Sequence, residues 1–192
     1  MTARTHDLAA VTALGIVYVY SSQPSMTLAT VIVAVFANLI GGVTPDIDQP
    51  TAPLWRNLPV GKFFGKVFDT LLGGHRFLTH SLLGLALFGF LAHLLLVFLQ
   101  PILGSTDIGL VWWAFMIGMA SHLVMDTLTK EGVPWLLPVP IKFGFPPLRK
   151  WRVTTGKSVE NWIVFPLLLI VNAIFYGQHY QQVLYILHHN IV

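Results

Sequence analysis

The chain has 192 residues, of which 55% are hydrophobic and only 10% are charged, and its mean hydropathy is +0.70. This composition excludes an ordinary soluble domain and predicts an integral membrane protein. The formal net charge of +3 would suit a nucleic-acid partner, but positive-inside topology explains it more economically, and no specific nucleic acid is expected. Because the chain has no cysteine, any metal must be bound by histidines and carboxylates.

Five apolar runs predict an all-α membrane protein with a single domain over residues 1–192. In chain order they cover residues 7–21, 26–43, 81–99, 108–128 and 160–177. The first run is short, since about 20 residues are needed to cross the hydrocarbon core, and it spans only if its polar flanks lie in the interfaces. The N-terminus lacks the order of regions of a signal peptide, so we interpret the first run as a retained span.

The segments between the runs are more polar. Pro45 and Pro50 end regular helix after the second run. Residues 61–72 carry apolar side chains at helical spacing, which predicts a short amphipathic helix on the membrane surface. Residues 129–157 predict a long loop rich in Pro, Gly and Trp, and residues 178–192 suit an interfacial helix.

This five-span topology predicts an orientation. The N-terminus, residues 43–81 and residues 129–159 lie on one side, and together they contain all eleven Lys and Arg residues. By the positive-inside rule that side is cytoplasmic, and the C-terminus lies outside. The clean partition depends on the first run crossing the membrane.

The same topology brings the candidate site residues to the cytoplasmic face. His122 and Asp126 are four residues apart and share one helix face. His75 and His80 are five apart, so we expect His75 in a loop and His80 in the first turn of the third span. Thr79 and Ser81 are candidates to cap that span or to hold a ligand by hydrogen bonds. The complete set at this face is His6, Asp7, Asp46, Asp48, His75, Arg76, His80, His122, Asp126 and Glu160.

Imidazole and carboxylate groups in this number suit Zn²⁺, Mn²⁺ or Fe²⁺, with one or two ions. The residues that we predict as metal ligands are Asp46, Asp48, His75, His80, His122, Asp126 and, as a further candidate, His6. Each pair alone is more typical of a structural hydrogen bond, and a purely structural polar network is the alternative for the whole set. Two ions could activate water and bind a phosphoryl oxygen, so hydrolysis of a phosphoester is the chemistry we favour.

Two further residues are candidates for catalysis. Arg76 can bind a phosphate bidentately, or it is only a topology-setting charge. Glu160 is a candidate ligand or general base. His93 is excluded, because it lies about 20 Å beyond His80 along a helix.

The motifs resemble a bacterial family of inner-membrane, metal-dependent hydrolases, some members of which are under LexA control. The resemblance rests, with His6 and Glu160, on Pro45-Asp46-Ile47-Asp48, on His75-Arg76-x-x-Thr79-His80-Ser81, and on Ser121-His122-x-x-x-Asp126-x-x-Thr129 followed by Gly132-Val133-Pro134-Trp135. It implies a hydrolase in the bacterial inner membrane. A looser similarity to zinc-dependent phospholipase C and P1-type nucleases implies phosphoester chemistry with Zn²⁺.

Together these observations predict a membrane-bound, metal-dependent hydrolase of a phosphoester. A lipid headgroup is the favoured substrate, because a site at this depth can receive it while the acyl chains stay in the bilayer. The alternative is a non-enzymatic metal-binding scaffold or sensor in the membrane. The sequence leaves the oligomeric state open.

Overall fold

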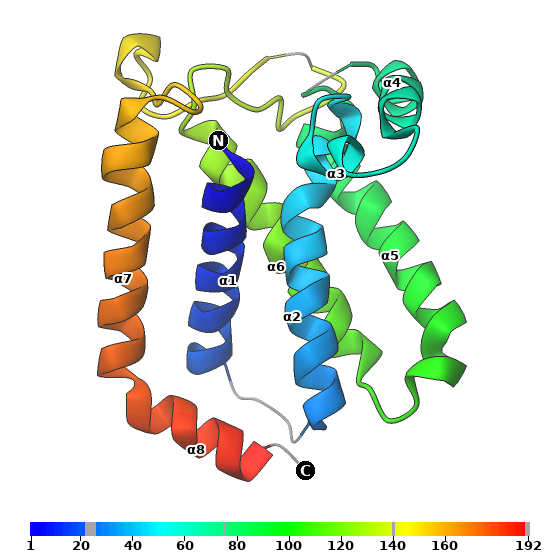
Figure 1. Cartoon of the computed structure of the whole chain (residues 1–192), viewed down its shortest axis with the longest axis vertical. Coiled ribbons are helices and arrows are strands. Elements are labelled where there is room, and N and C mark those ends of the chain that lie inside the picture. Colours follow the sequence, from blue (N-terminus) through cyan, green and yellow to red (C-terminus); the bar gives the residue numbers. More distant parts are fainter. Residues whose placement is uncertain (22–25, 75, 140, 191–192) are drawn as a thin grey trace.

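The computed structural model describes residues 1–21, 26–74, 76–139 and 141–190, and within these ranges it contains helices and no β-strand. Five long helices form the body of the molecule, and they run side by side (Figure 1). They are α1 (Ala3–Tyr20), α2 (Leu28–Val43), α5 (Leu82–Leu103), α6 (Ile108–Thr127) and α7 (Phe165–Gln178), the last continuing a π-helical turn at Glu160–Val164.

The shorter helices lie at the two ends of this bundle. Most of them gather at the end that carries the N-terminus, whereas α8 (Tyr180–Asn190) crosses the opposite end (Figure 1). Those at the N-terminal end are the 3₁₀ segments Thr44–Asp48, Leu78–His80 and Arg149–Trp151, with α3 (Pro53–Arg56) and α4 (Gly61–Leu71). The long loop after α6 lies at this end too.

Four helical segments of the described chain are long and apolar enough to cross a membrane, namely Leu28–Asp48, Leu82–Leu103, Ile108–Thr127 and Glu160–Gln178. Helix α1 is not among them, because its first turns are polar, but its 18 residues extend about 27 Å. It lies against α2, α6 and α7 (Figure 1). The prediction of an all-α integral membrane protein with about five long helices is therefore confirmed.

The third apolar run differs from its predicted boundaries at both ends. Helix α5 begins at Leu82, because the Ser81 side chain caps it by accepting the Gly84 backbone N–H at 3.0 Å. His80 therefore lies in a 3₁₀ turn before the helix. The prediction that it lies in the first turn of the third span is wrong. At the other end the helix extends beyond residue 99, continues through Pro101 to Leu103 and ends at Gly104.

Helices α2 and α6 approach each other closely through glycines. A Cβ atom on Gly41 would lie 2.1 Å from the backbone oxygen of Phe115, and one on Gly118 would lie 2.0 Å from that of Asn38. Small residues of this kind let membrane helices pack backbone to backbone. The contact holds α6 one turn before His122, so it fixes the position of that histidine against the end of α2.

The amphipathic helix predicted for residues 61–72 is confirmed as α4. Phe63, Phe64 and Leu71 are exposed on it. Its other face packs on the buried Trp55, whose ring stacks on Phe68 and whose indole N–H donates to the backbone oxygen of Ile47 at 2.9 Å. The helix is thereby attached to the 3₁₀ segment that carries Asp46 and Asp48.

Candidate metal centre

Histidines and carboxylates from four separate elements meet at the N-terminal end of the bundle. His6 comes from α1, His80 from the turn before α5, and His122 and Asp126 from α6. The 3₁₀ segment after α2 adds Asp46 and Asp48. All six are buried except Asp46, whose side chain is 17% exposed. His75, the remaining predicted ligand, lies outside the described residues.

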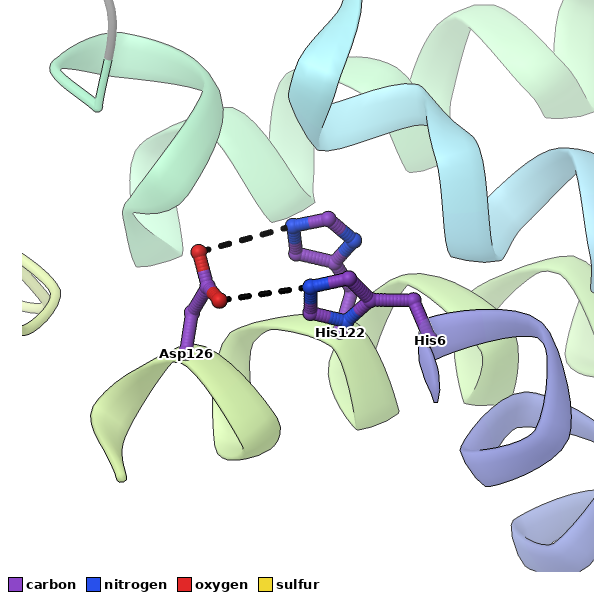
Figure 2. Close-up of side chains that lie close together, drawn as sticks. All are labelled: His6, His122 and Asp126. Atoms are coloured by element: carbon purple, nitrogen blue, oxygen red, sulfur yellow. Dashed lines mark ion pairs between the residues drawn. The ribbon is translucent and has the colours of Figure 1, made fainter. Parts of the chain in front are cut away.

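The geometry forms two groups that could each hold a metal ion. One contains His6, His122 and Asp126, and the other contains Asp46, His80 and His122. Within each group, one nitrogen or oxygen atom per residue lies within 4.8 Å of the others. Figure 2 shows the first group, with both imidazole rings facing the Asp126 carboxylate. His6 Nε2 is 3.2 Å from Asp126 Oδ1, and His122 Nε2 is 3.8 Å from Oδ2.

His122 belongs to both groups, and its protonation is set by the backbone. Its Nδ1 lies 2.6 Å from the carbonyl oxygen of Gly42, so Nδ1 carries the proton and Nε2 presents a lone pair. Nε2 is buried with no hydrogen-bond partner among the described residues. A metal-binding histidine usually donates from one ring nitrogen to a backbone carbonyl, while its other ring nitrogen faces the metal. His122 has this arrangement, with Nε2 directed toward the carboxylates.

The three histidine rings pack against one another. His6 stacks on His122 with ring centroids 3.6 Å apart and planes 8° apart, and His80 meets His122 edge-on at 5.3 Å. His122 therefore contacts both of the other imidazole rings and brings the three histidines into one cluster.

Arg76 holds Asp126 in place. Its guanidinium lies 2.5 Å from Asp126 Oδ2 and donates to Thr129 Oγ1 at 2.9 Å. The amino group of Met1 contacts the other carboxylate oxygen of Asp126. The arginine side chain is only 6% exposed, so its contacts give it a positioning role. The predicted phosphate contact of Arg76 stays a prediction.

Asp48 lies behind the two groups. Its Oδ2 accepts the backbone N–H of Arg76 at 3.0 Å and the hydroxyl of Thr79, and lies 3.7 Å from His80 Nδ1. Burial by itself lowers the pKa of His80, but hydrogen bonds and charges from Asp126 and Asp48 outweigh it and raise the pKa above its ordinary value. In this arrangement Asp48 orients His80 and the preceding turn. Among the described residues it belongs to neither candidate group, so its role as a metal ligand stays a prediction.

Glu160 also lies outside both groups. Its Oε1 accepts the backbone N–H of Thr2 at 2.6 Å and the hydroxyls of Thr2 and Thr5 at 2.7 Å each, and Oε2 accepts the Gly156 N–H at 2.7 Å. These four donors occupy the carboxylate that we had predicted as a ligand or general base. Glu160 instead ties the start of α1, and with it His6, to the start of α7.

We expect Glu160→Gln to lower the free energy of unfolding by about 1–3 kcal/mol, because an amide NH₂ would face an N–H donor in a buried site. Metal affinity should change little. Chemical denaturation in detergent and metal titration measure the two effects, with Asp69→Asn on α4, outside both candidate metal groups, as the control for loss of a carboxylate. A fully stable Glu160→Gln variant that binds metal but loses turnover would restore the role of general base.

A cavity of about 350 Å³ opens beside the cluster. It reaches two of the predicted ligands, His6 and Asp46, so a solute has access to the site. Its other lining residues are Ala3, Asp7, Gly42, Val43, Asn57 and Leu58. Asn57 and Leu58 carry no recognisable motif, and only the fold brings them here. The carbonyl of Gly42, which sets the His122 tautomer, likewise has no signal in the sequence.

Comparisons with known proteins agree with a membrane family. The chain is 28% identical to the protein named "Uncharacterized protein YvsG" of Bacillus subtilis (strain 168) over 177 residues, which cover 92% of this chain and 95% of that protein. It is 32% identical to the inner membrane protein YdjM of Escherichia coli (strain K12) over 130 residues, 65% of this chain and 58% of that protein. No solved structure matches. Residues 1–183 match the family model described as YdjM inner membrane protein, so the chain belongs to the YdjM inner membrane protein family.

Proposed function

We propose that the protein is a hydrolase of the inner membrane that uses a divalent metal, Zn²⁺ in preference to Mn²⁺ or Fe²⁺, to cleave a phosphoester bond. The observation that carries the proposal is the Nε2 atom of His122. It is buried, it has no hydrogen-bond partner among the described residues, and it lies 3.8 Å from both Asp46 Oδ1 and Asp126 Oδ2. A buried nitrogen left without a partner is costly unless a ligand fills the gap.

The donor set favours one well-held ion. Since Nδ1 of His122 is used by Gly42, only Nε2 is available, and one imidazole nitrogen binds one ion. The two groups therefore cannot each hold an ion through His122. We propose that His6, His122 and Asp126 hold the first ion, and that Asp46 and His80 either complete its shell or begin a second site.

The bound ion would polarise a water molecule and a phosphoryl oxygen, which is the chemistry that phosphoester hydrolysis needs. The chain supplies the rest. Arg76 keeps the Asp126 carboxylate oriented and charged, Asp48 and Thr79 orient His80, and the cavity admits the substrate beside His6 and Asp46. Histidine nitrogens with carboxylate oxygens are the usual ligands of catalytic Zn²⁺.

A lipid headgroup is the proposed source of the phosphoester. The cluster lies where the apolar segments end, so a headgroup could enter while the acyl chains remain in the bilayer. We propose that this end is cytoplasmic, and the C-terminal end outside. The segments at this end (Figure 1) contain all eleven Lys and Arg residues, which supports the orientation by the positive-inside rule.

The proposal predicts metal-dependent turnover. Protein purified in detergent and stripped with EDTA should not hydrolyse bis(p-nitrophenyl) phosphate, and Zn²⁺, Mn²⁺ or Fe²⁺ should restore hydrolysis. Release of p-nitrophenolate measures the rate, and heat-denatured protein with the same ion controls for hydrolysis by the ion alone. Stoichiometric metal without turnover of any phosphomonoester or phosphodiester would contradict the hydrolase and favour a metal-binding scaffold or sensor.

A further inference from the structure

The cavity beside the cluster has an unusual charge balance. Two of its eight lining residues are acidic, Asp7 and Asp46, and none of those described is Lys or Arg. Two basic residues directly adjoin lining residues in the sequence. Arg4 is engaged elsewhere, since it donates to Asn161 Oδ1 at 2.6 Å and stacks on the Phe165 ring, and Arg56, beside Asn57, is exposed and does not line the cavity. The wall itself therefore offers carboxylates and no competing cation, which favours a substrate with a positively charged arm.

Asp7 is the acidic group that the cluster leaves unused. Asp46 lies 3.8 Å from both His80 and His122 and belongs to a candidate metal group. The carboxylate of Asp7 is partly buried, yet the described part of the chain offers it neither a hydrogen bond nor an ion pair. Asp7 lines the cavity together with His6, and successive side chains on a helix point about 100° apart, so Asp7 lies outside the two candidate metal groups.

We infer that this cavity binds the amino-alcohol arm of a phosphodiester, such as an ethanolamine-type group, with Asp7 as the partner of its ammonium ion. The inference rests on the proposed function, because the phosphate is placed at the metal. The arrangement separates the two charges of the substrate, with the phosphate toward His6 and Asp46 and the ammonium toward Asp7. A volume of about 350 Å³ lies at the small end of ligand sites, which suits one short polar arm.

Two small phosphonates test this binding without turnover. 2-Aminoethylphosphonate and 2-hydroxyethylphosphonate differ only in an ammonium or a hydroxyl group, and their C–P bond resists hydrolysis. Calorimetric titration of Zn²⁺-loaded protein in detergent should show about tenfold tighter binding of the amino compound. Asp7→Asn, which keeps the shape of the side chain, should bring the two affinities together. Asp69→Asn, which removes a charge on α4 outside the cavity, should preserve the difference.

Hydrolysis identifies the source of the arm. Phosphatidylethanolamine and phosphatidylglycerol in matched nanodiscs test a lipid, and glycerophosphoethanolamine tests a soluble diester. We expect phosphatidylethanolamine to be cleaved faster than phosphatidylglycerol if the source is a lipid, and glycerophosphoethanolamine to be cleaved if the source is soluble. Asp7→Asn should remove the preference for the ethanolamine compound, and Asp69→Asn, outside the cavity, should keep it.

The two proposals fail differently. Equal affinity for the two phosphonates, or a preference that survives Asp7→Asn, would overturn the inference while hydrolysis of the chromogenic diester persists. The opposite result would be a protein that hydrolyses no diester with any metal, yet binds the amino phosphonate more tightly and loses that preference in Asp7→Asn. This result would overturn the hydrolase and leave an amino-phosphate binding site.

Discussion

Replacement of His122 by alanine should lower the affinity for divalent metal by more than about 100-fold and abolish metal-dependent hydrolysis. His122 is the one residue common to both candidate groups, and its Nε2 faces Asp46 and Asp126. No other described histidine has one ring nitrogen tied to the backbone of α2 and the other directed into the cluster. Loss of this side chain therefore removes a ligand from either way of filling the site.

The effect must be separated from a loss of fold. His122→Ala also leaves the Gly42 carbonyl without its donor, which costs about 1–3 kcal/mol. His122→Asn is the companion variant, since its amide N–H can replace the donor to the Gly42 carbonyl, whereas the shorter side chain cannot reproduce the position of Nε2. His93→Ala, at an exposed position on α5, is the matched histidine control. Competition with a zinc chelator measures affinity, and circular dichroism measures helix content. A folded His122→Ala protein with unchanged metal affinity would contradict the site.

Arg76→Met should destabilise the protein by about 3–5 kcal/mol, because it breaks a buried charge pair by removing one partner. The guanidinium and the Asp126 carboxylate are 2.5 Å apart, at 6% and 1% exposure. Arg76 also connects α6 to the following loop through Thr129. Denaturant titration in detergent measures the change, and metal affinity should fall with it, since Asp126 loses its orientation.

Arg76→Lys distinguishes charge from geometry. A lysine keeps the positive charge but cannot bond Asp126 and Thr129 with one planar fork, so we expect a loss between those of wild type and Arg76→Met. Lys157→Met, at an exposed position, removes a charge from the same end as a control. If Arg76 bound the phosphate of the substrate instead, Arg76→Met would keep its stability and raise KM. That outcome would overturn the positioning role.

The helices were the most predictable part of the protein. Apolar runs identify α2, α5, α6 and α7 within a few residues, because each helix must present a continuous apolar surface to lipid or to its neighbouring helices. Errors fell at ends that are decided by single contacts. The Ser81 cap moved His80 out of α5, and α1 begins at Ala3, earlier than expected, with its polar first turn helical.

The gathering of site residues at one end followed from topology, whereas their roles did not. Spacing places His122 and Asp126 on one face of α6, and span order brings His6 and His80 to the same end. The carboxylates of Asp48 and Glu160 accept from backbone N–H groups, at Arg76, Thr2 and Gly156, and from threonine hydroxyls, and no sequence pattern identifies these partners. The sequence alone therefore cannot distinguish a carboxylate that binds the proposed metal from one that only supports neighbouring residues. The orientation in the membrane stays a prediction.

Metal content is the most direct test of the central claim. Elemental mass spectrometry on protein purified in detergent without chelators, wild type beside His122→Ala, measures ions bound per chain. We expect about one tightly held Zn²⁺ or related ion in the wild type and its loss from a variant that keeps its helix content. A wild-type protein that contains no metal, and takes up neither Zn²⁺ nor Mn²⁺ on reconstitution, would contradict the metal centre and the hydrolase proposed from it.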